Sequence, residues 1–139
     1  MTQGPLHRTQ RVVAAVVRRG DTFLVCRRAA HKRHGGLWEF PGGKVGPNES
    51  DANAVGRELR EELGVTLVTA HSAEFEIADP DSPFLIAFVP VVIQDEPACH
   101  EHSELRWVTA AALLDLTLAP GDARYVEWLQ QHRTRRDVA

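Results

Sequence analysis

One amphipathic helix, set among several segments that favour β-structure, is the feature that most constrains the fold of this chain. Ser50 suits the N-cap of the helix and Gly64 suits its C-terminal stop, so the pattern predicts a helix that ends at about Leu63. Segments rich in β-favouring residues predict strands at 11–19, 22–26, 38–40, 65–70, 74–78, 84–93 and 105–108. One strong helix among so many strands predicts a mixed sheet with helices packed on it.

The other elements are shorter, and turn-forming residues set their boundaries. Gly20-Asp21 suits a hairpin turn between the first two strands, and residues 44–49 should be irregular because they contain glycine and proline. A short helix is expected at 110–114 and a closing helix at 122–132. The length of 139 residues fits one domain, which we place at 10–133, between a frayed N-terminus (1–9) and a C-terminal tail (134–139).

Charge and hydropathy exclude several classes of partner. The formal net charge is −3, whereas a protein that coats duplex DNA usually carries a basic surplus, so we expect no nucleic acid polymer as a partner. No apolar run approaches the ~20 residues of a membrane span, and no apolar signal core begins the chain, so we expect no membrane partner. We therefore expect a cytoplasmic protein, a monomer or homodimer, in which Cys26 and Cys99 are free thiols.

Three glutamates share one stripe of the predicted helix. At 100° per residue, Glu58, Glu61 and Glu62 fall in one arc beside the apolar face, where like charges cost a few tenths of a kcal/mol per pair. One interpretation is a solvated acidic face. The other is a site for a hard cation such as Mg²⁺, which takes oxygen ligands and suits phosphate chemistry. Only a divalent ion would reconcile these glutamates with a phosphate substrate.

The spacing around the helix follows one motif throughout. The residues that fit G-x5-E-x7-R-E-U-x-E-E-x-G-U, where U is apolar, are Gly43, Glu49, Arg57, Glu58, Leu59, Glu61, Glu62, Gly64 and Val65. This motif is the Nudix box, and a chance match is expected in roughly one chain in a million from residue frequencies. The chain therefore resembles a Nudix hydrolase of the MutT type. The segments LWEFPGGK (37–44), ACHEHSELRW (98–107) and LAPGD (118–122) extend the resemblance, most closely to the bacterial CTP pyrophosphohydrolase branch.

The resemblance implies both a fold and a reaction. The fold would be an α/β/α sandwich around a mixed sheet. The reaction would be Mg²⁺-dependent hydrolysis of a nucleoside or deoxynucleoside triphosphate to the monophosphate and pyrophosphate, with Mn²⁺ as a substitute metal. A cytosine nucleotide or an oxidised nucleotide would be the substrate, in cleansing of the nucleotide pool. The alternatives are hydrolysis of ADP-ribose or another nucleotide sugar, and a non-catalytic Nudix module that senses nucleotides.

The same resemblance assigns the metal-binding and catalytic residues. The metal ligands would be Glu58, Glu61, Glu62, Glu101 and the carbonyl of Gly42. Glu58 is favoured as the general base, with Glu101 as the alternative, because members of the family differ in which glutamate has this role. Glu61 would serve the metal in catalysis, and Arg57 would orient a glutamate of the helix through a charge-assisted hydrogen bond. Glu49 would brace the preceding loop. A zinc site at residues 99–102 is disfavoured, because this run of ligand-type residues lacks the spacing of structural zinc sites.

Substrate contacts are expected from the basic loop, from the segment before the box and from the start of the last helix. The residues are Arg28, Arg33, Glu39, Phe40, Pro41, Gly42, Lys44 and Asp122. Strand alternation should bury one of Trp38 and Phe40 and leave the other as a wall for the base.

Asp122 is the most informative residue for the choice of base. An ionised carboxylate would accept from cytosine N4 or adenine N6, whereas a protonated, buried Asp122 would reverse that preference. Asp122 also suits a helix N-cap, and the two roles are compatible.

Overall fold

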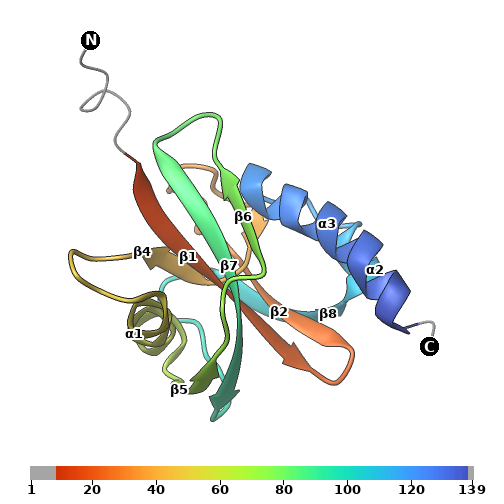
Figure 1. Cartoon of the computed structure of the whole chain (residues 1–139), viewed down its shortest axis with the longest axis horizontal. Helices are drawn as coiled ribbons and strands as arrows, with labels where there is room; N and C mark the ends of the chain where they lie inside the picture. Colours follow the sequence, from red (N-terminus) through yellow and green to blue (C-terminus); the bar gives the residue numbers. More distant parts are fainter. Residues whose placement is uncertain (1–8, 138–139) are drawn as a thin grey trace.

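The computed structural model describes residues 9–137, and a mixed sheet forms its centre (Figure 1). The strands are β1 (Gln10–Arg19), β2 (Thr22–Arg27), β3 (Trp38–Glu39), β4 (Gly42–Lys44), β5 (Thr66–Ala70), β6 (Phe75–Ala78), β7 (Phe84–Gln94) and β8 (Glu104–Thr109). The order is β3-β2-β1-β7-β5, with β4 on β1, β6 on β7 and β8 on β2. β1 runs parallel to β7 and antiparallel to β2 and β4, so the predicted mixed sheet is confirmed.

Helices cover both faces of this sheet. α1 (Asp51–Leu63) lies on one face, and α2 (Ala110–Leu113) and α3 (Pro120–Asp137) lie on the other (Figure 1). β1 alternates between two cores: Val13 and Val17 pack with the buried side of α1, while Ala14 and Val16 pack with α2 and α3. Each fully buried Val, Leu or Phe contributes about 1.5–3 kcal/mol. The α/β/α sandwich that the resemblance implied is confirmed.

Both ends of α1 are capped as the sequence predicts. The Ser50 hydroxyl accepts a hydrogen bond from the backbone N–H of Asn53 (3.1 Å), and Gly64 adopts a left-handed conformation with φ of 68°. The loop that precedes β8 then satisfies the last carbonyls of the helix. The backbone N–H of His100 donates to Glu62 O (2.9 Å), and that of Ala98 donates to Leu63 O (3.0 Å). This docking brings the loop at 98–103 to the acidic helix.

Several boundaries differ from the prediction. Gly42–Lys44 forms β4 on β1, although Lys44 was expected to be irregular and Gly42 to end the previous strand. A Cβ at Gly42 would meet the Val13 carbonyl, so only glycine permits this close pairing. α3 begins at Pro120, since proline suits the first turn of a helix, and it continues to Asp137. The predicted helix, 122–132, was thus too short at both ends.

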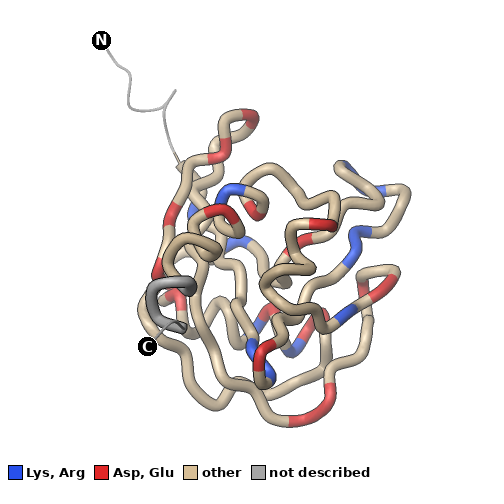
Figure 2. The backbone as a smooth tube through the Cα atoms, turned by 90° about the vertical axis from the view of Figure 1, so that its right-hand side faces the viewer, with Lys and Arg blue, Asp and Glu red and all other residues tan. Residues whose placement is uncertain are grey.

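Two expectations concern the ends and the surroundings of the chain. The N-terminus expected to fray lies outside the described residues except for Thr9, and so do residues 138–139 of the expected tail. Within the described part of the chain, no helix is both long and apolar enough to cross a membrane. Acidic and basic positions are interspersed in the view of Figure 2, in keeping with the small net charge.

Candidate active site

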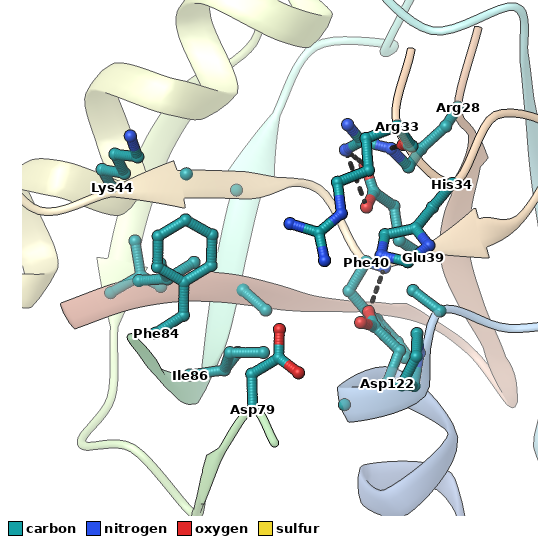
Figure 3. Close-up of a pocket in the computed structure, with 18 residues that line it drawn as sticks. Arg28, Arg33, His34, Glu39, Phe40, Lys44, Asp79, Phe84, Ile86 and Asp122 are labelled. Atoms are coloured by element: carbon teal, nitrogen blue, oxygen red, sulfur yellow. Dashed lines mark hydrogen bonds and ion pairs between the residues drawn. The ribbon is translucent and has the colours of Figure 1, made fainter. Parts of the chain in front are cut away.

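Two neighbouring cavities share three of their lining residues. The first, the α3 cavity, has a volume of about 300 Å³ and lies between β4, the loop before β7 and the start of α3 (Figure 3). The second, the acidic cavity, has a volume of about 190 Å³ and is lined by Arg28, Ala29, Lys32, Glu39, Gly42, Glu62, Glu101 and His102. Arg28, Glu39 and Gly42 line both, so the two cavities adjoin at these residues.

Arg57 joins α1 to the loop that precedes it. Its Nε and Nη2 each donate to a different oxygen of Glu49 (2.9 Å), and its Nη1 donates to Glu58 Oε2 (2.9 Å). Glu49 Oε1 also accepts from the Gly46 N–H (2.8 Å), which ties the loop before α1 to the helix. The pKa of Glu49 is lowered to about 2 by Arg57 first and by this backbone N–H second. These are the contacts expected of Arg57 and Glu49.

Glu58 lies against the backbone of β4. A Cβ at Gly43 would fall 2.4 Å from the Glu58 carboxylate, so the first glycine of the motif makes room for this side chain. The Glu58 side chain is only 14% exposed, whereas that of Glu61 is 53% exposed. Glu61 lies 3.6 Å from Arg57 Nη1, and of the three glutamates only Glu62 lines the acidic cavity. The three glutamates of the helix are therefore not equivalent.

Glu62 is the most buried member of the set, although the helical arc grouped it with Glu58 and Glu61. Its pKa is raised to about 9, first by burial and then by the neighbouring Glu58, with further contributions from Glu39 and Glu101. Its Oε1 is buried and has no hydrogen-bond partner. A buried acceptor without a donor, crowded by other carboxylates, is an environment that a divalent cation would relieve.

The other expected metal ligands lie close by. Glu101 and Gly42 line the same cavity as Glu62, and the docking of the 98–103 loop onto α1 explains how Glu101 reaches it. In the part of the chain that the structure describes, no three His, Cys, Asp or Glu side chains are gathered closely enough to hold an ion. The donor set therefore suits Mg²⁺ in its chemistry, whereas its carboxylates would have to move closer together to bind the ion, and Glu61 would have to turn inward to join them.

Asp122 lies at the floor of the α3 cavity and is not the N-cap. Because α3 begins at Pro120, Asp122 belongs to the first turn, and its Oδ2 accepts from the backbone N–H of Phe40 (2.8 Å; Figure 3). Burial raises the pKa of Asp122 to about 8, and Glu39 adds to this, while the Phe40 N–H acts in the opposite direction. The expectation of a capping aspartate was wrong, and a buried acid that holds its proton at neutral pH replaces it.

Phe40 and Trp38 are both buried, so the expectation that only one of them would be core was wrong. Residues two apart in a strand point to the same face, and Trp38 and Phe40 accordingly lie in the same core cluster. Phe40 packs edge-on against Phe88 and Tyr125 in the core under α3, while also lining the cavity. The Pro41 carbonyl accepts from the Ala15 N–H (2.7 Å), which fixes this segment to the sheet.

The cationic residues expected to bind substrate enter from two sides. Arg28 and Arg33 come from the loop between β2 and β3, and Lys44 comes from the end of β4 (Figure 3). Arg28 Nη1 lies 3.3 Å from Glu39, and Lys44 Nζ lies 5.6 Å from the centre of the Phe84 ring. All three line the α3 cavity, as do Glu39 and Gly42.

Several residues that line the two cavities were not predicted as site residues from the sequence. His34, Asp79, Phe84 and Ile86 also line the α3 cavity, and His102 lines the acidic cavity. Asp79 and Phe84 flank the irregular loop between β6 and β7, whose approach to the cavity depends on long-range strand pairing. His102 lies in the 98–107 segment that extends the resemblance and directly follows Glu101, but it was considered only as part of a disfavoured zinc site.

Comparison with known proteins finds a matching family, similar sequences and a similar solved structure. The NUDIX domain pattern matches residues 8–129. The chain is 38% identical over 120 residues to "Putative 8-oxo-dGTP diphosphatase 2" of Mycobacterium tuberculosis, covering 84% of this chain and 85% of the relative. It is 36% identical over 128 residues to the CTP pyrophosphohydrolase of Escherichia coli, covering 90% and 94%. The solution structure of the Escherichia coli ORF135 protein aligns with a TM-score of 0.80 at 34% identity, covering 93% of this chain and 94% of that one.

Proposed function

The chain belongs to the Nudix family and is a hydrolase of that family, and from this premise we propose that it converts a nucleoside triphosphate, with Mg²⁺, to the monophosphate and pyrophosphate. The observation that carries the proposal is the pair of adjoining cavities. One contains clustered carboxylates, and the other contains a single buried acid, with Arg28, Glu39 and Gly42 between them. Such a pair suits a ligand with a charged phosphate end and a planar base.

The acidic cavity would hold the metal. Glu62, Glu101 and the Gly42 carbonyl would be its ligands, joined by Glu58 and Glu61. When bound, Mg²⁺ would neutralise phosphate charge and lower the pKa of a water molecule. Glu58, which Arg57 holds in a fixed orientation, would accept the proton of the attacking water.

The cations of the β2–β3 loop and β4 would orient the polyphosphate. Arg28 and Arg33 present planar guanidinium groups, which suit phosphate oxygens, and Lys44 adds a third positive charge. Water would attack the β-phosphorus. The bond between that phosphorus and the oxygen that bridges it to the α-phosphorus would break, and the monophosphate would leave with that oxygen. The oxygen of water would therefore end in pyrophosphate.

The state of Asp122 supports a guanine-type base. A protonated carboxyl donates through its O–H, and guanine O6 is an acceptor. We therefore propose 8-oxo-dGTP, the nucleotide in the name of the mycobacterial relative, as the preferred substrate at neutral pH. CTP is the second candidate, because an ionised Asp122 would accept from cytosine N4 and the relative from Escherichia coli is named for CTP.

A product assay in ¹⁸O-labelled water tests this proposal. The protein would be incubated with Mg²⁺ and 8-oxo-dGTP, dGTP, CTP, dCTP or ADP-ribose, with EDTA and Glu58→Gln as controls. We expect monophosphate and labelled pyrophosphate, fastest from 8-oxo-dGTP, and no product with EDTA. Label in the monophosphate would overturn attack at the β-phosphorus. Cleavage of ADP-ribose alone would favour the nucleotide-sugar alternative, and faster cleavage of CTP would favour the second candidate.

A further inference from the structure

His102 lies between two carboxylates that come from different elements of the fold. Its Nε2 is 2.9 Å from Glu39 Oε2 on β3, and its Nδ1 is 3.9 Å from Glu62 Oε1 on α1. The His102 side chain is only 9% exposed. An ionised carboxylate only accepts hydrogen bonds, so the Nε2–H of His102 donates to Glu39. The ring therefore spans the acidic cavity from the strand to the helix.

The contact continues from Glu39 into the substrate loop. Glu39 binds Arg28 Nη1 through both oxygens (3.3 Å), and Arg28 Nε donates to the carbonyl of Arg33 (2.7 Å). Glu39 lies at the middle of this chain of contacts, with His102 on one side and Arg28 on the other (Figure 3 shows the Arg28 side). Without His102, Glu39 Oε2 would keep only the longer contact with Arg28 Nη1 (3.3 Å), and the carboxylate would be held less firmly beside Arg28.

The backbone on both sides of His102 is fixed to the rest of the fold. The N–H of His100 donates to Glu62 O (2.9 Å), and the N–H of Ser103 donates to Arg27 O (3.0 Å). The first bond fixes the loop to α1 and the second fixes it to β2. A ring held at both flanks is a rigid support for Glu39, unlike a side chain on a free loop.

We propose that His102 is a positioning residue: it holds Glu39, and through Glu39 it holds Arg28 and the Arg33 backbone in place beside the metal-binding carboxylates. The inference rests on the proposed function insofar as the two arginines contact the nucleotide. It goes beyond that function by assigning a role to a side chain that acts through Glu39. A histidine that served only packing would affect stability and leave the arginines unchanged.

Two substitutions of His102 test the contributions of its two ring nitrogens separately. In His102→Gln, the amide nitrogen takes the place of Nε2 and can still donate to Glu39. In His102→Asn, the amide nitrogen takes the place of Nδ1, so the bond to Glu39 is lost. His71→Asn, at an exposed histidine outside both cavities, is the matched control.

The first measurement is the hydrogen exchange of the Arg28 Nε–H, followed by NMR in the protein without nucleotide or metal. We expect the signal to be protected in the wild type, in His102→Gln and in His71→Asn, and to exchange at least several-fold faster in His102→Asn. Equal protection in His102→Asn, in a protein that retains its far-UV circular dichroism, would overturn the proposal. This measurement stands whether or not any triphosphate is hydrolysed.

The second measurement is steady-state kinetics on whichever nucleotide the wild type hydrolyses. We expect His102→Asn to raise KM about tenfold with a much smaller change in kcat, and His102→Gln to restore KM to within about twofold of the wild type. Equal losses in both variants, or a loss confined to kcat, would overturn the role of the Glu39 bond. Hydrolysis of no triphosphate by the wild type would count against the proposed function alone, because the exchange measurement still decides the role of His102.

Discussion

Two buried acids on opposite faces of the sheet, Glu62 and Asp122, have similar burial and opposite surroundings. Their relative exposures are 5% and 7%, and burial is the first cause of the raised pKa of each. Glu62 has other carboxylates as its neighbours and an oxygen without a partner. Asp122 accepts a backbone hydrogen bond from Phe40 and lies in a cavity that is also lined by Arg28 and Arg33.

The difference shows that burial alone does not define the role of an acid. At Glu62, neighbouring negative charge adds to the cost of desolvation, and a divalent cation would remove both costs. At Asp122, protonation alone removes the cost of burying a charge, and the protonated carboxyl keeps an O–H that can donate to a ligand. A raised pKa therefore supports a metal ligand at Glu62, on the α1 face, and a neutral hydrogen-bond donor to the base at Asp122, on the α3 face.

The largest expected effect comes from removing the charge of Glu62. Glu62→Gln keeps the shape of the side chain but weakens it as a metal ligand, so we expect kcat with Mg²⁺ to fall about a hundredfold or more while the fold persists. Steady-state kinetics and circular dichroism check this. Glu127→Gln, at an exposed glutamate on α3, is the control and should retain wild-type kinetics. Near-normal turnover of Glu62→Gln would break the contrast between the two acids.

Removing the carboxyl of Asp122 should change selectivity more than turnover. We expect Asp122→Ala to reduce the preference for 8-oxo-dGTP over CTP by about tenfold to a hundredfold, because a hydrogen bond to the base discriminates by about 1–3 kcal/mol. The ratio of kcat/KM values for the two nucleotides measures this. In the wild type the ratio should also fall as the pH rises through about 8, when Asp122 ionises. Asp122→Asn, which stays neutral, should hold its ratio constant, and a parallel fall in that variant would refute the assignment.

Metal binding should separate the two acids without any substrate. Mg²⁺ at a hundredfold excess over its dissociation constant stabilises the folded protein by about 2.7 kcal/mol. We expect this shift in thermal unfolding for the wild type and for Asp122→Asn, and a much smaller one for Glu62→Gln. Equal shifts in all three proteins would place the metal away from Glu62.

Local rules predicted most of the fold and part of the site. Ser50 and Gly64 end α1 as expected, because capping depends on neighbours in sequence. Gly56 costs about 1 kcal/mol relative to alanine in a helix, and in the structure an added Cβ there would lie 3.3 Å from Leu67 on β5. That contact joins two elements, so no local rule contains it.

The parts that sequence reasoning missed depend on long-range packing. The burial of Asp122 arises where α3 meets Phe40, 82 positions away in sequence, and that meeting sets its protonation. The burial of Glu62 likewise requires the 98–103 loop to dock on the end of α1. The motif indicated which glutamates matter, but only the docked loop shows that one of them is buried and another is exposed.

The smallest effect concerns the stability of the protein without metal as a function of pH. The pKa of Asp122 is raised to about 8 in the folded protein from an ordinary value near 4 in the unfolded chain, so the folded state holds the proton more tightly. Its contribution is complete below pH 4 and is lost as the pH rises towards 8, by up to about 1.4 kcal/mol per pH unit. Asp122→Asn should not lose this contribution, so urea unfolding in EDTA at pH 6 and pH 8 should show a smaller decline for it than for the wild type. The stability of Asp115→Asn, a variant at an exposed aspartate, should decline between pH 6 and pH 8 as that of the wild type does.

The loss of stability that remains in Asp122→Asn belongs to groups such as Glu62. Mg²⁺ should reduce that part alone, because the cation stabilises the ionised form of its ligands and leaves Asp122 untouched. Should Mg²⁺ instead cancel the difference between the wild type and Asp122→Asn, the two acids would share one site.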